Sequence, residues 1–183
     1  MSQPPKESRF TCACFELTEV LVSAVLAIAI LFSFALRFAG VLGHSMLPTL
    51  HHHDRLAVTA HMSTPRRGAI VIISPRANDY REPLVKRIVA IAGDEVDLRD
   101  GRVWINGQAT DEPYLPASIE TSPAPGLSDL EFPVVVPENE VFVLGDNRGG
   151  STDSRHGAVG FVRTDDILGR VLFRMWPSPR AGF

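Results

Sequence analysis

Residues 84–93 read LVKRIVAIAG, and this stretch decides the fold class of the chain. Branched apolar residues over this length, closed by a glycine, are typical of a buried β-strand. Two cations interrupt the strand. Strand alternation places Lys86 on the face of Ile88 and Ala90, and it places Arg87 on the opposite face. Because apolar residues occupy both faces, each cation is expected to have apolar neighbours.

Similar short runs of β-branched residues recur on both sides of this strand. Turn residues separate them, and they occupy residues 54–60, 68–74, 95–107, 132–136, 141–146 and 166–177. Asp100–Gly101 favours a hairpin turn. Several strands with few helix caps predict a mainly β domain over residues 40–183, barrel-like or folded over on itself. Between about 107 and 137 the chain is rich in Pro, Ser, Thr, Ala and Asp, which predicts a mobile surface loop or small lobe.

A long apolar run precedes this domain. Residues 20–36 contain no charge, and an extension to residues 17–38 gives 22 residues. As a helix this segment would be about 33 Å long, which matches the hydrocarbon core of a bilayer. We therefore expect a transmembrane signal-anchor helix over residues 17–38. A removable signal peptide is the alternative, but the uninterrupted run is long for one.

The flanking charges give the expected span a direction. Lys6 and Arg9 precede it, and Arg37 follows it at once. The positive-inside bias then favours a cytoplasmic tail over residues 1–16. The rest of the chain would be a single-pass protein of the cell membrane, with residues 40–183 on the outer face.

The sequence GHSMLPT at residues 43–49 is the first candidate for chemistry. Gly43 permits backbone dihedrals that other residues rarely adopt. Pro48 prevents a continuing helix and favours an extended or turning backbone. In such a segment Ser45 is either a linker residue or a nucleophile held near the membrane surface.

Lys86 is the second candidate, because lysine can lose its proton at accessible cost and arginine cannot. At an ordinary pKa near 10.4, roughly one lysine in a few thousand is neutral at pH 7. Burial can lower that pKa by up to about 3–5, which would make Lys86 a working base. The alternative is a lysine whose stem packs in the core while its head reaches water.

The third candidate is the loop LGDNRGGSTDSRHG at residues 144–157, directly after a predicted strand. We expect Asp146 and Asp153 to pair with Arg148 and Arg155. One interpretation is a surface turn with salt bridges, each worth about 0–1 kcal/mol. The other is a scaffold that supports a site, since the loop carries more polar chemistry than a turn needs.

Histidine is the competing base and the competing metal ligand. Residues 51–54 read HHHD, but consecutive residues of a strand point to opposite faces. Three histidines in a row therefore rarely converge on one ion, and we expect no metal site. A triad of Ser45, Asp153 and His156 is conceivable from residue types alone. The spacing gives no reason for the His156 imidazole to reach Ser45.

These segments, in this order and behind an N-terminal anchor, resemble the type I signal peptidases. GHSMLPTL is similar to the family's nucleophile box, VKRIVAIAGDEV to its lysine box and LGDNRGGSTDSRHGAVG to its C-terminal signature. The stretches RRGAIVII, GRVWING, DEPYL and ILGRVLFRMWP fit the intervening and closing parts. The resemblance covers about residues 40–177 plus the anchor, and a single span is similar to the Gram-positive members.

The resemblance implies a signal-peptidase-type β catalytic core with roles for particular residues. Ser45 would be the nucleophile and Lys86 the general base. Ser151 would hydrogen-bond the lysine amine and orient it. An ion-paired framework would hold the loop and would comprise Asp146, Asp153 and Arg155. Gly43 stands where some members have a serine that helps to bind the oxyanion, so the second oxyanion donor is open.

The implied activity is that of a membrane-anchored serine endopeptidase without a cofactor. It would remove N-terminal signal peptides from secreted preproteins after small residues at −3 and −1. Expected partners are secretory preproteins and membrane lipid, with the secretion machinery as a further candidate. The net charge of −3 argues against nucleic acid. The alternatives are a membrane-tethered β binding module without catalysis and a self-cleaving Ser/Lys protease, although proteases of that kind are soluble and carry a DNA-binding module.

Overall fold

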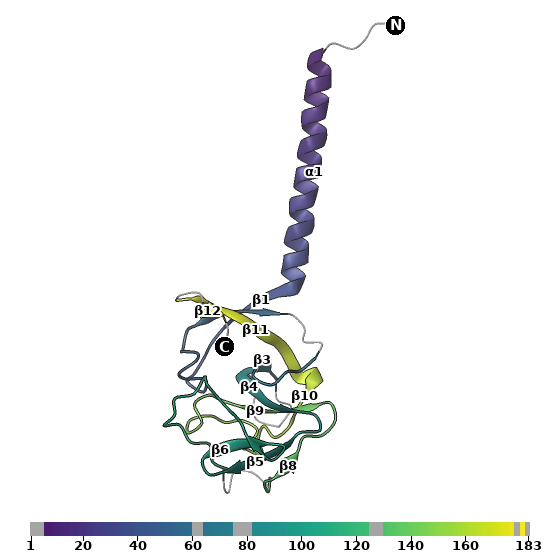
Figure 1. Ribbon diagram of the computed structural model, residues 1–183. Helices are drawn as coiled ribbons and strands as arrows, with labels where there is room; N and C mark the ends of the chain where they lie inside the picture. The colour runs from purple at the N-terminus through teal and green to yellow at the C-terminus, as the bar shows by residue number, and fades with distance from the viewer. Residues whose placement is uncertain (1–5, 60–63, 75–81, 125–129, 178–179, 182–183) are drawn as a thin grey trace. The chain divides into compact units, whose positions relative to one another are not determined.

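The computed structural model describes residues 6–59, 64–74, 82–124, 130–177 and 180–181, with the side chains of its helix described over residues 15–30. Within these residues the chain forms one α-helix, α1 (Lys6–Ala35), then strands β1 to β12 and a 3-10 turn, η1 (Thr164–Asp166) (Figure 1). It divides into two compact units, Met1–Leu36 and Arg37–Phe183. The prediction of a mainly β fold with one helix is confirmed.

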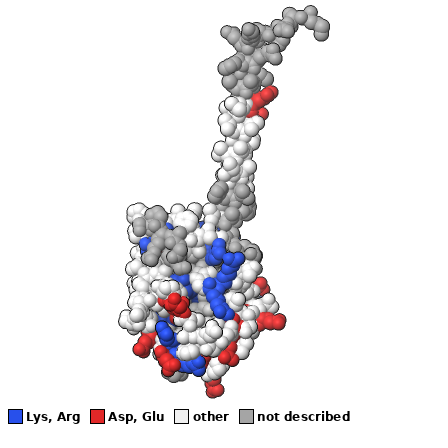
Figure 2. Space-filling model, in the orientation of Figure 1, with Lys and Arg blue, Asp and Glu red and all other residues white. Residues whose placement is uncertain are grey.

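The bounds of helix α1 differ from those of the predicted span. The helix begins at Lys6, inside the predicted tail, and ends at Ala35, three residues before the predicted end. It ends there because the following residues pair with β2 as strand β1 (Leu36–Gly40). The described side chains of the helix are exposed. In Figure 2 the acidic groups of this described helical segment lie near its N-terminal end. Among the described residues, no helix reaches the combined length and hydropathy of a membrane span.

The larger sheet has the strand order β1–β2–β11–β3–β4–β9–β10, and β12 pairs with β11. The strands after β1 are β2 (Arg55–Thr59), β3 (Ile70–Ile73), β4 (Leu84–Ile91), β9 (Glu140–Leu144), β10 (Val162–Arg163), β11 (Ile167–Trp176) and β12 (Arg180–Ala181). Strand β11 joins the two halves of the sheet, since its first residues pair with β3 and its later residues with β2. Register shifts in both pairings let it bend.

The smaller sheet has the order β7–β6–β5–β8. Its strands are β5 (Glu95–Arg99), β6 (Arg102–Ile105), β7 (Gln108–Ala109) and β8 (Val134–Val135). The predicted hairpin is confirmed: β5 and β6 pair antiparallel, and Arg99 lies opposite Arg102. Asp100 and Gly101 both have positive φ, 53° and 71°, as a two-residue turn of this kind requires.

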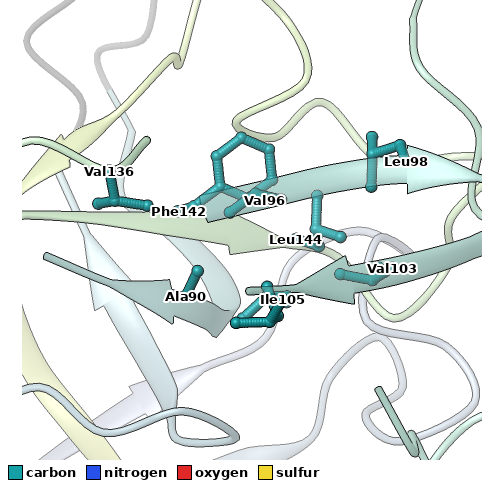
Figure 3. Packing of buried hydrophobic residues seen from close by; sticks show 9 residues of the cluster. Ala90, Val96, Leu98, Val103, Ile105, Val136, Phe142 and Leu144 are labelled. Carbon is teal, nitrogen blue, oxygen red and sulfur yellow. The ribbon is translucent and has the colours of Figure 1, made fainter. Parts of the chain in front are cut away.

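The two sheets share a hydrophobic core. Figure 3 shows Phe142 and Leu144 of β9 and Ala90 of β4 packed against side chains of the β5–β6 hairpin. Phe142 is fully buried, and the rings of Phe132 and Phe161 meet it edge-on at centroid distances of 6.1 and 6.0 Å. This packing fixes β9 and β4, two neighbouring strands that carry parts of the candidate site.

Strict alternation along β4 holds only for its first half. The register against β9 shifts between Ile88 and Ala90, so one extra residue lies on β4 at this point. As a result Val89 and Ala90 both join the core between the sheets, whereas Ile88 belongs to a different cluster. The expectation that Lys86, Ile88 and Ala90 share one face is therefore wrong for Ala90.

The segment from 107 to 137 is more ordered in its contacts than the predicted surface loop. It contributes β7 and β8, and residues 125–129 lie outside the described part. Its backbone is tied to the hairpin, since the Thr121 N–H donates to the carbonyl of Gly101 at 2.8 Å. Side chains of this segment also reach the candidate site, as described below.

At Gly169, strand β11 passes close to β2. A Cβ atom at this position would lie 2.1 Å from the Thr59 carbonyl oxygen and 2.7 Å from Val58 Cγ1. Because a backbone carbonyl cannot move aside like a flexible side chain, Gly169→Ala should lower the free energy of unfolding by about 1–3 kcal/mol. Urea unfolding of the full chain in detergent, followed by tryptophan fluorescence, measures this change.

Gly40 on β1 offers the matched control, because a Cβ atom there meets nothing within 4 Å. Gly40→Ala should change the free energy of unfolding by no more than about 0.5 kcal/mol. An unfolding free energy of Gly169→Ala equal to that of the unsubstituted chain would contradict the close approach of the two strands.

Candidate active site

Ser45 lies half-buried in a turn that follows a positive-φ glycine. Gly43 has φ +95°, a conformation that favours glycine. Two backbone hydrogen bonds close the turn, from the Leu47 N–H to the His44 carbonyl and from the Leu50 N–H to the Met46 carbonyl. Met46 and Leu50 are buried in an apolar cluster, which anchors the turn while Ser45 keeps partial access to solvent.

The amine of Lys86 reaches this serine. Lys86 Nζ donates to Ser45 Oγ at 2.9 Å. The lysine comes from β4, pairs in register with Val71 of β3 and is only 2% exposed. Among the described residues it makes no ion pair with a carboxylate. The two residues predicted as a catalytic pair, 41 positions apart in the sequence, therefore lie together.

Burial changes the acid–base chemistry of Lys86. Desolvation is the largest influence and lowers its pKa from an ordinary 10.5 to about 8, although the negative charge of Asp153 opposes the change. The positive charge of Arg155 lowers the pKa further. A pKa of about 8 leaves roughly one lysine in ten neutral at pH 7, against roughly one in three thousand at 10.5. A neutral amine at this distance can accept a proton from the hydroxyl.

Arg87, the neighbouring cation on β4, binds Asp146. Its Nε and Nη2 donate to the two carboxylate oxygens of Asp146 at 2.9 and 2.7 Å. The expectation that Asp146 pairs with an arginine of its own loop, Arg148 or Arg155, is wrong, because Arg87 reaches it from the adjacent strand. Thr49 Oγ1 also donates to Asp146, at 2.5 Å, so the aspartate ties the serine turn to β4. All three side chains are buried.

The expected pair of Asp153 and Arg155 is confirmed as a buried two-pronged ion pair. Arg155 Nε and Nη2 donate to Asp153 at 2.8 and 2.9 Å, and the arginine also donates to the carbonyls of Arg148 and Ser122. Asp153 Oδ2 accepts the Gly145 N–H at 3.0 Å. The pair therefore fixes the loop that follows β9, as the framework role requires.

Asn147 adds a direct link from this loop to the serine turn. Its backbone N–H donates to the Ser45 carbonyl at 3.0 Å, and its side-chain amide donates to the His44 carbonyl at 3.1 Å. Gly145 packs against the same turn, since a Cβ atom there would stand 2.5 Å from the Ser45 carbonyl oxygen. The loop and the turn are thus in van der Waals and hydrogen-bond contact.

Ser151 lies in the same close-packed region but without the predicted hydrogen bond. A Cβ atom on Gly145 would meet Ser151 Oγ at 2.1 Å, which places this hydroxyl beside the loop backbone. Its oxygen is buried and makes no hydrogen bond to any described residue. The orientation of the Lys86 amine by Ser151 is therefore not supported by a contact here.

The backbone N–H of Ser45 makes no hydrogen bond with another described residue. The neighbouring Gly43 N–H instead donates to His52 Nδ1 at 3.0 Å. The glycine that replaces a serine in the family pattern thus presents neither a hydroxyl nor a free backbone donor.

His156 does not join Ser45. Its Nδ1 accepts a long hydrogen bond of 3.4 Å from the Asp153 N–H, and the Asp153 carboxylate is engaged by Arg155 and Gly145. No hydrogen bond joins His156 to Ser45 in the described residues, so the triad interpretation is unsupported. Within the described residues, no three His, Cys, Asp or Glu side chains come close enough to share a metal ion.

Three residues that the sequence interpretation missed, two partly buried and one buried, extend this network. Glu112 binds both terminal nitrogens of Arg148, at 2.9 and 2.6 Å, and accepts the Tyr114 hydroxyl at 2.5 Å. Thr121 also accepts a hydrogen bond from Arg148. The stretch DEPYL, which combines acids and an aromatic residue in an otherwise small and polar segment, was the available signal. Its contacts with residues far along the chain were not readable from the sequence.

Comparison with known proteins identifies the family. A family model described as signal peptidase, peptidase S26, matches residues 14–176. A probable signal peptidase I-2 of Synechocystis is 36% identical over 185 residues, covering 97% of this chain and 80% of that protein. Signal peptidase I of Bacillus amyloliquefaciens is 35% identical over 181 residues, covering 96% of this chain and 95% of that protein.

One further sequence relative and one solved structure are also similar to this chain. Signal peptidase I S of Bacillus subtilis is 36% identical over 168 residues, covering 88% of this chain and 89% of that protein. A crystal structure of a signal peptidase I from Enterococcus faecalis is 30% identical, with a TM-score of 0.47, and covers 60% of this chain and 97% of that chain. The family match and the sequence relatives confirm the resemblance of the motifs, and the chain belongs to the signal peptidase family, peptidase S26.

Proposed function

We propose that this protein is a membrane-anchored serine endopeptidase that removes signal peptides from secreted preproteins, with Ser45 as nucleophile and Lys86 as general base. One observation carries the assignment of roles. A buried lysine amine with a lowered pKa lies 2.9 Å from the hydroxyl of a partly accessible serine. Family membership supports the reaction class, since the relatives are named as signal peptidases.

The proposed reaction begins with proton transfer within this pair. Neutral Lys86 takes the hydroxyl proton as Ser45 Oγ attacks the scissile carbonyl carbon, which forms a tetrahedral oxyanion. When the C–N bond breaks, the lysine gives the proton to the departing amine, and an acyl-serine ester remains. Water then attacks the ester carbonyl as Lys86 takes a proton from it. When the C–O bond to Ser45 breaks, the lysine returns the proton to Ser45 Oγ, and the acid product leaves.

The oxyanion would be stabilised by the free N–H of Ser45. One backbone donor of this kind contributes about 3–4 kcal/mol to the transition state in comparable sites. The Gly43 N–H is already bonded to His52, so it could act as a second donor only if that hydrogen bond were broken. We propose a substrate in extended form, with small residues at −3 and −1, as the secretory signal pattern has.

We also propose that the apolar run at residues 17–38 anchors the protein in the membrane. The proposal rests on the uncharged residues 20–36 and on the match of the extended run to the thickness of a bilayer. In this topology residues 1–16 lie in the cytoplasm and residues 40–183 form the catalytic domain on the outer face, where preproteins emerge. Membrane lipid and the secretion machinery would then be its neighbours.

A cleavage assay on a preprotein tests the catalytic pair. Ser45→Ala and Lys86→Ala should each lower turnover by about 10⁴-fold or more, because neither half of the pair works without the other. Lys86→Arg should be equally inactive, since a guanidinium keeps its proton. The purified full chain in detergent and a labelled preprotein provide the measurement.

His156→Ala is the control that separates this pair from a triad, and it should cleave the preprotein at close to the unsubstituted rate. Substantial turnover by Lys86→Arg would refute proton transfer by the lysine. An inactive but folded His156→Ala would point to a histidine base instead.

The lowered pKa of Lys86 predicts a pH dependence with a definite sign. The protonated amine cannot act as a base, so kcat/KM should rise about tenfold per pH unit below the pKa and level off above it. The midpoint should lie near pH 8, the value to which burial lowers the pKa of Lys86. A profile that is flat between about pH 6 and pH 9 would contradict the assignment.

A further inference from the structure

Tyr114 lies between two ion pairs, one buried and one partly buried, that the proposed mechanism does not itself use. The Arg87 guanidinium carbon stands 3.7 Å from the centroid of its ring. Its hydroxyl donates to Glu112 Oε1 at 2.5 Å, and the same oxygen accepts Arg148 Nη2 at 2.6 Å. One side chain thus contacts the Arg87–Asp146 pair through its ring face and the Glu112–Arg148 pair through its hydroxyl.

Through its ring, Tyr114 is connected by way of Arg87 to both members of the catalytic pair. Arg87 directly follows Lys86 on β4, so the direction of its side chain is coupled to the backbone that carries the lysine. Through Asp146 the same guanidinium reaches Thr49 Oγ1, which belongs to the turn that carries Ser45. A flat ring against a flat guanidinium group restricts how that group can rotate.

Through its hydroxyl, Tyr114 is connected by way of Glu112 and Arg148 to the loop after β9. Arg148, held by Glu112, donates from Nε to the Gly145 carbonyl at 3.1 Å. Gly145 packs within van der Waals distance of the Ser45 carbonyl oxygen, and its N–H is bound by Asp153. Burial and the negative charge of Glu112 raise the pKa of Tyr114, so the phenol stays protonated and remains a donor at any pH of interest.

We propose that Tyr114 is a positioning residue that couples the two ion pairs and so holds Ser45 and Lys86 at reacting distance. This inference rests on the proposed function of the pair. Tyr114 touches neither the reacting atoms nor the two catalytic side chains, and it acts through Arg87 and Glu112. Its loss should therefore slow the proton-transfer step without changing how well the substrate binds.

The test uses three variants of the full chain in detergent. Tyr114→Leu removes the ring and the hydroxyl, and Tyr114→Phe keeps the ring. The matched control is Trp104→Leu, because Trp104 makes a similar contact, 4.0 Å from its ring centroid to the Arg99 guanidinium carbon, on the smaller sheet. For each variant we would measure the rate at which a serine-reactive acylating inhibitor labels Ser45, as a function of pH, together with kcat, KM and the thermal unfolding temperature.

Tyr114→Leu should lower the acylation rate on the high-pH plateau by about 10- to 100-fold, the range expected for a misplacement of reacting groups near 1 Å. The midpoint of the pH profile should stay within about half a pH unit of the unsubstituted value, and KM should change less than about threefold. Tyr114→Phe should keep at least about a third of the plateau rate. Trp104→Leu should keep all of it.

Several results would overturn the inference. A plateau rate for Tyr114→Leu within twofold of the unsubstituted value would do so, as would an equal loss in Trp104→Leu. If Tyr114→Phe were acylated as slowly as Tyr114→Leu, the ring would not position the catalytic pair, and the inference would fail. If Tyr114→Leu does not fold, Tyr114→Met, which fills a similar volume without a ring face, takes its place under the same criteria.

Ser45→Ala, assayed alongside, separates the two possible failures. If Ser45→Ala is acylated and turns over preprotein as the unsubstituted chain does, the proposed function itself is wrong. If Ser45→Ala is neither acylated nor active while Tyr114→Leu reaches the plateau rate of the unsubstituted chain, the catalytic pair is supported. Only the proposed role of Tyr114 is then wrong.

Discussion

The buried amine of Lys86 depends on a balance between desolvation and nearby charge. Removal from water disfavours the ammonium form, and no described carboxylate lies close enough to restore it through an ion pair. Asp153 and Asp146 act only at longer range, and Arg155 partly offsets them. If either aspartate formed an ion pair with Lys86, the pKa of the lysine would rise and the amine would stay charged. The pKa of Lys86 therefore depends both on its burial and on the arginines that bind these carboxylates.

Arg87 and Arg155 occupy these two carboxylates. Each binds one aspartate with two parallel hydrogen bonds, a geometry that uses both carboxylate oxygens. Strand geometry sends the consecutive side chains of Lys86 and Arg87 to different faces, so a single strand carries the base and also the cation that occupies Asp146. Breaking such a buried pair typically costs about 3–5 kcal/mol. The same contacts thus stabilise the fold and keep both carboxylates from pairing with the lysine.

Local patterns predicted the strands and the β5–β6 hairpin well, because β-branched runs and an Asp-Gly turn act over a few residues. The candidate pair and the Asp153–Arg155 contact also agreed with expectation. Pairings that depend on strand order were out of reach: Arg87 and Asp146 are 59 positions apart, and Glu112 and Arg148 are 36 apart. The extra residue in β4 likewise has no local sequence signal, so the face of Ala90 was predicted wrongly. The membrane anchor, the domain limits and the roles of the site residues stay predictions.

The most direct test of the account is the pKa of Lys86 itself. Lys6 and Lys86 are the only lysines in the sequence, so ε-¹³C-lysine labelling of the full chain gives two resonances, and loss of one in Lys86→Ala assigns them. The account predicts that the Lys86 resonance titrates near pH 8, where burial places its pKa. Titration at the ordinary value of 10.5 would mean that the amine is charged at neutral pH, and it would contradict the proposed role of Lys86 as the base.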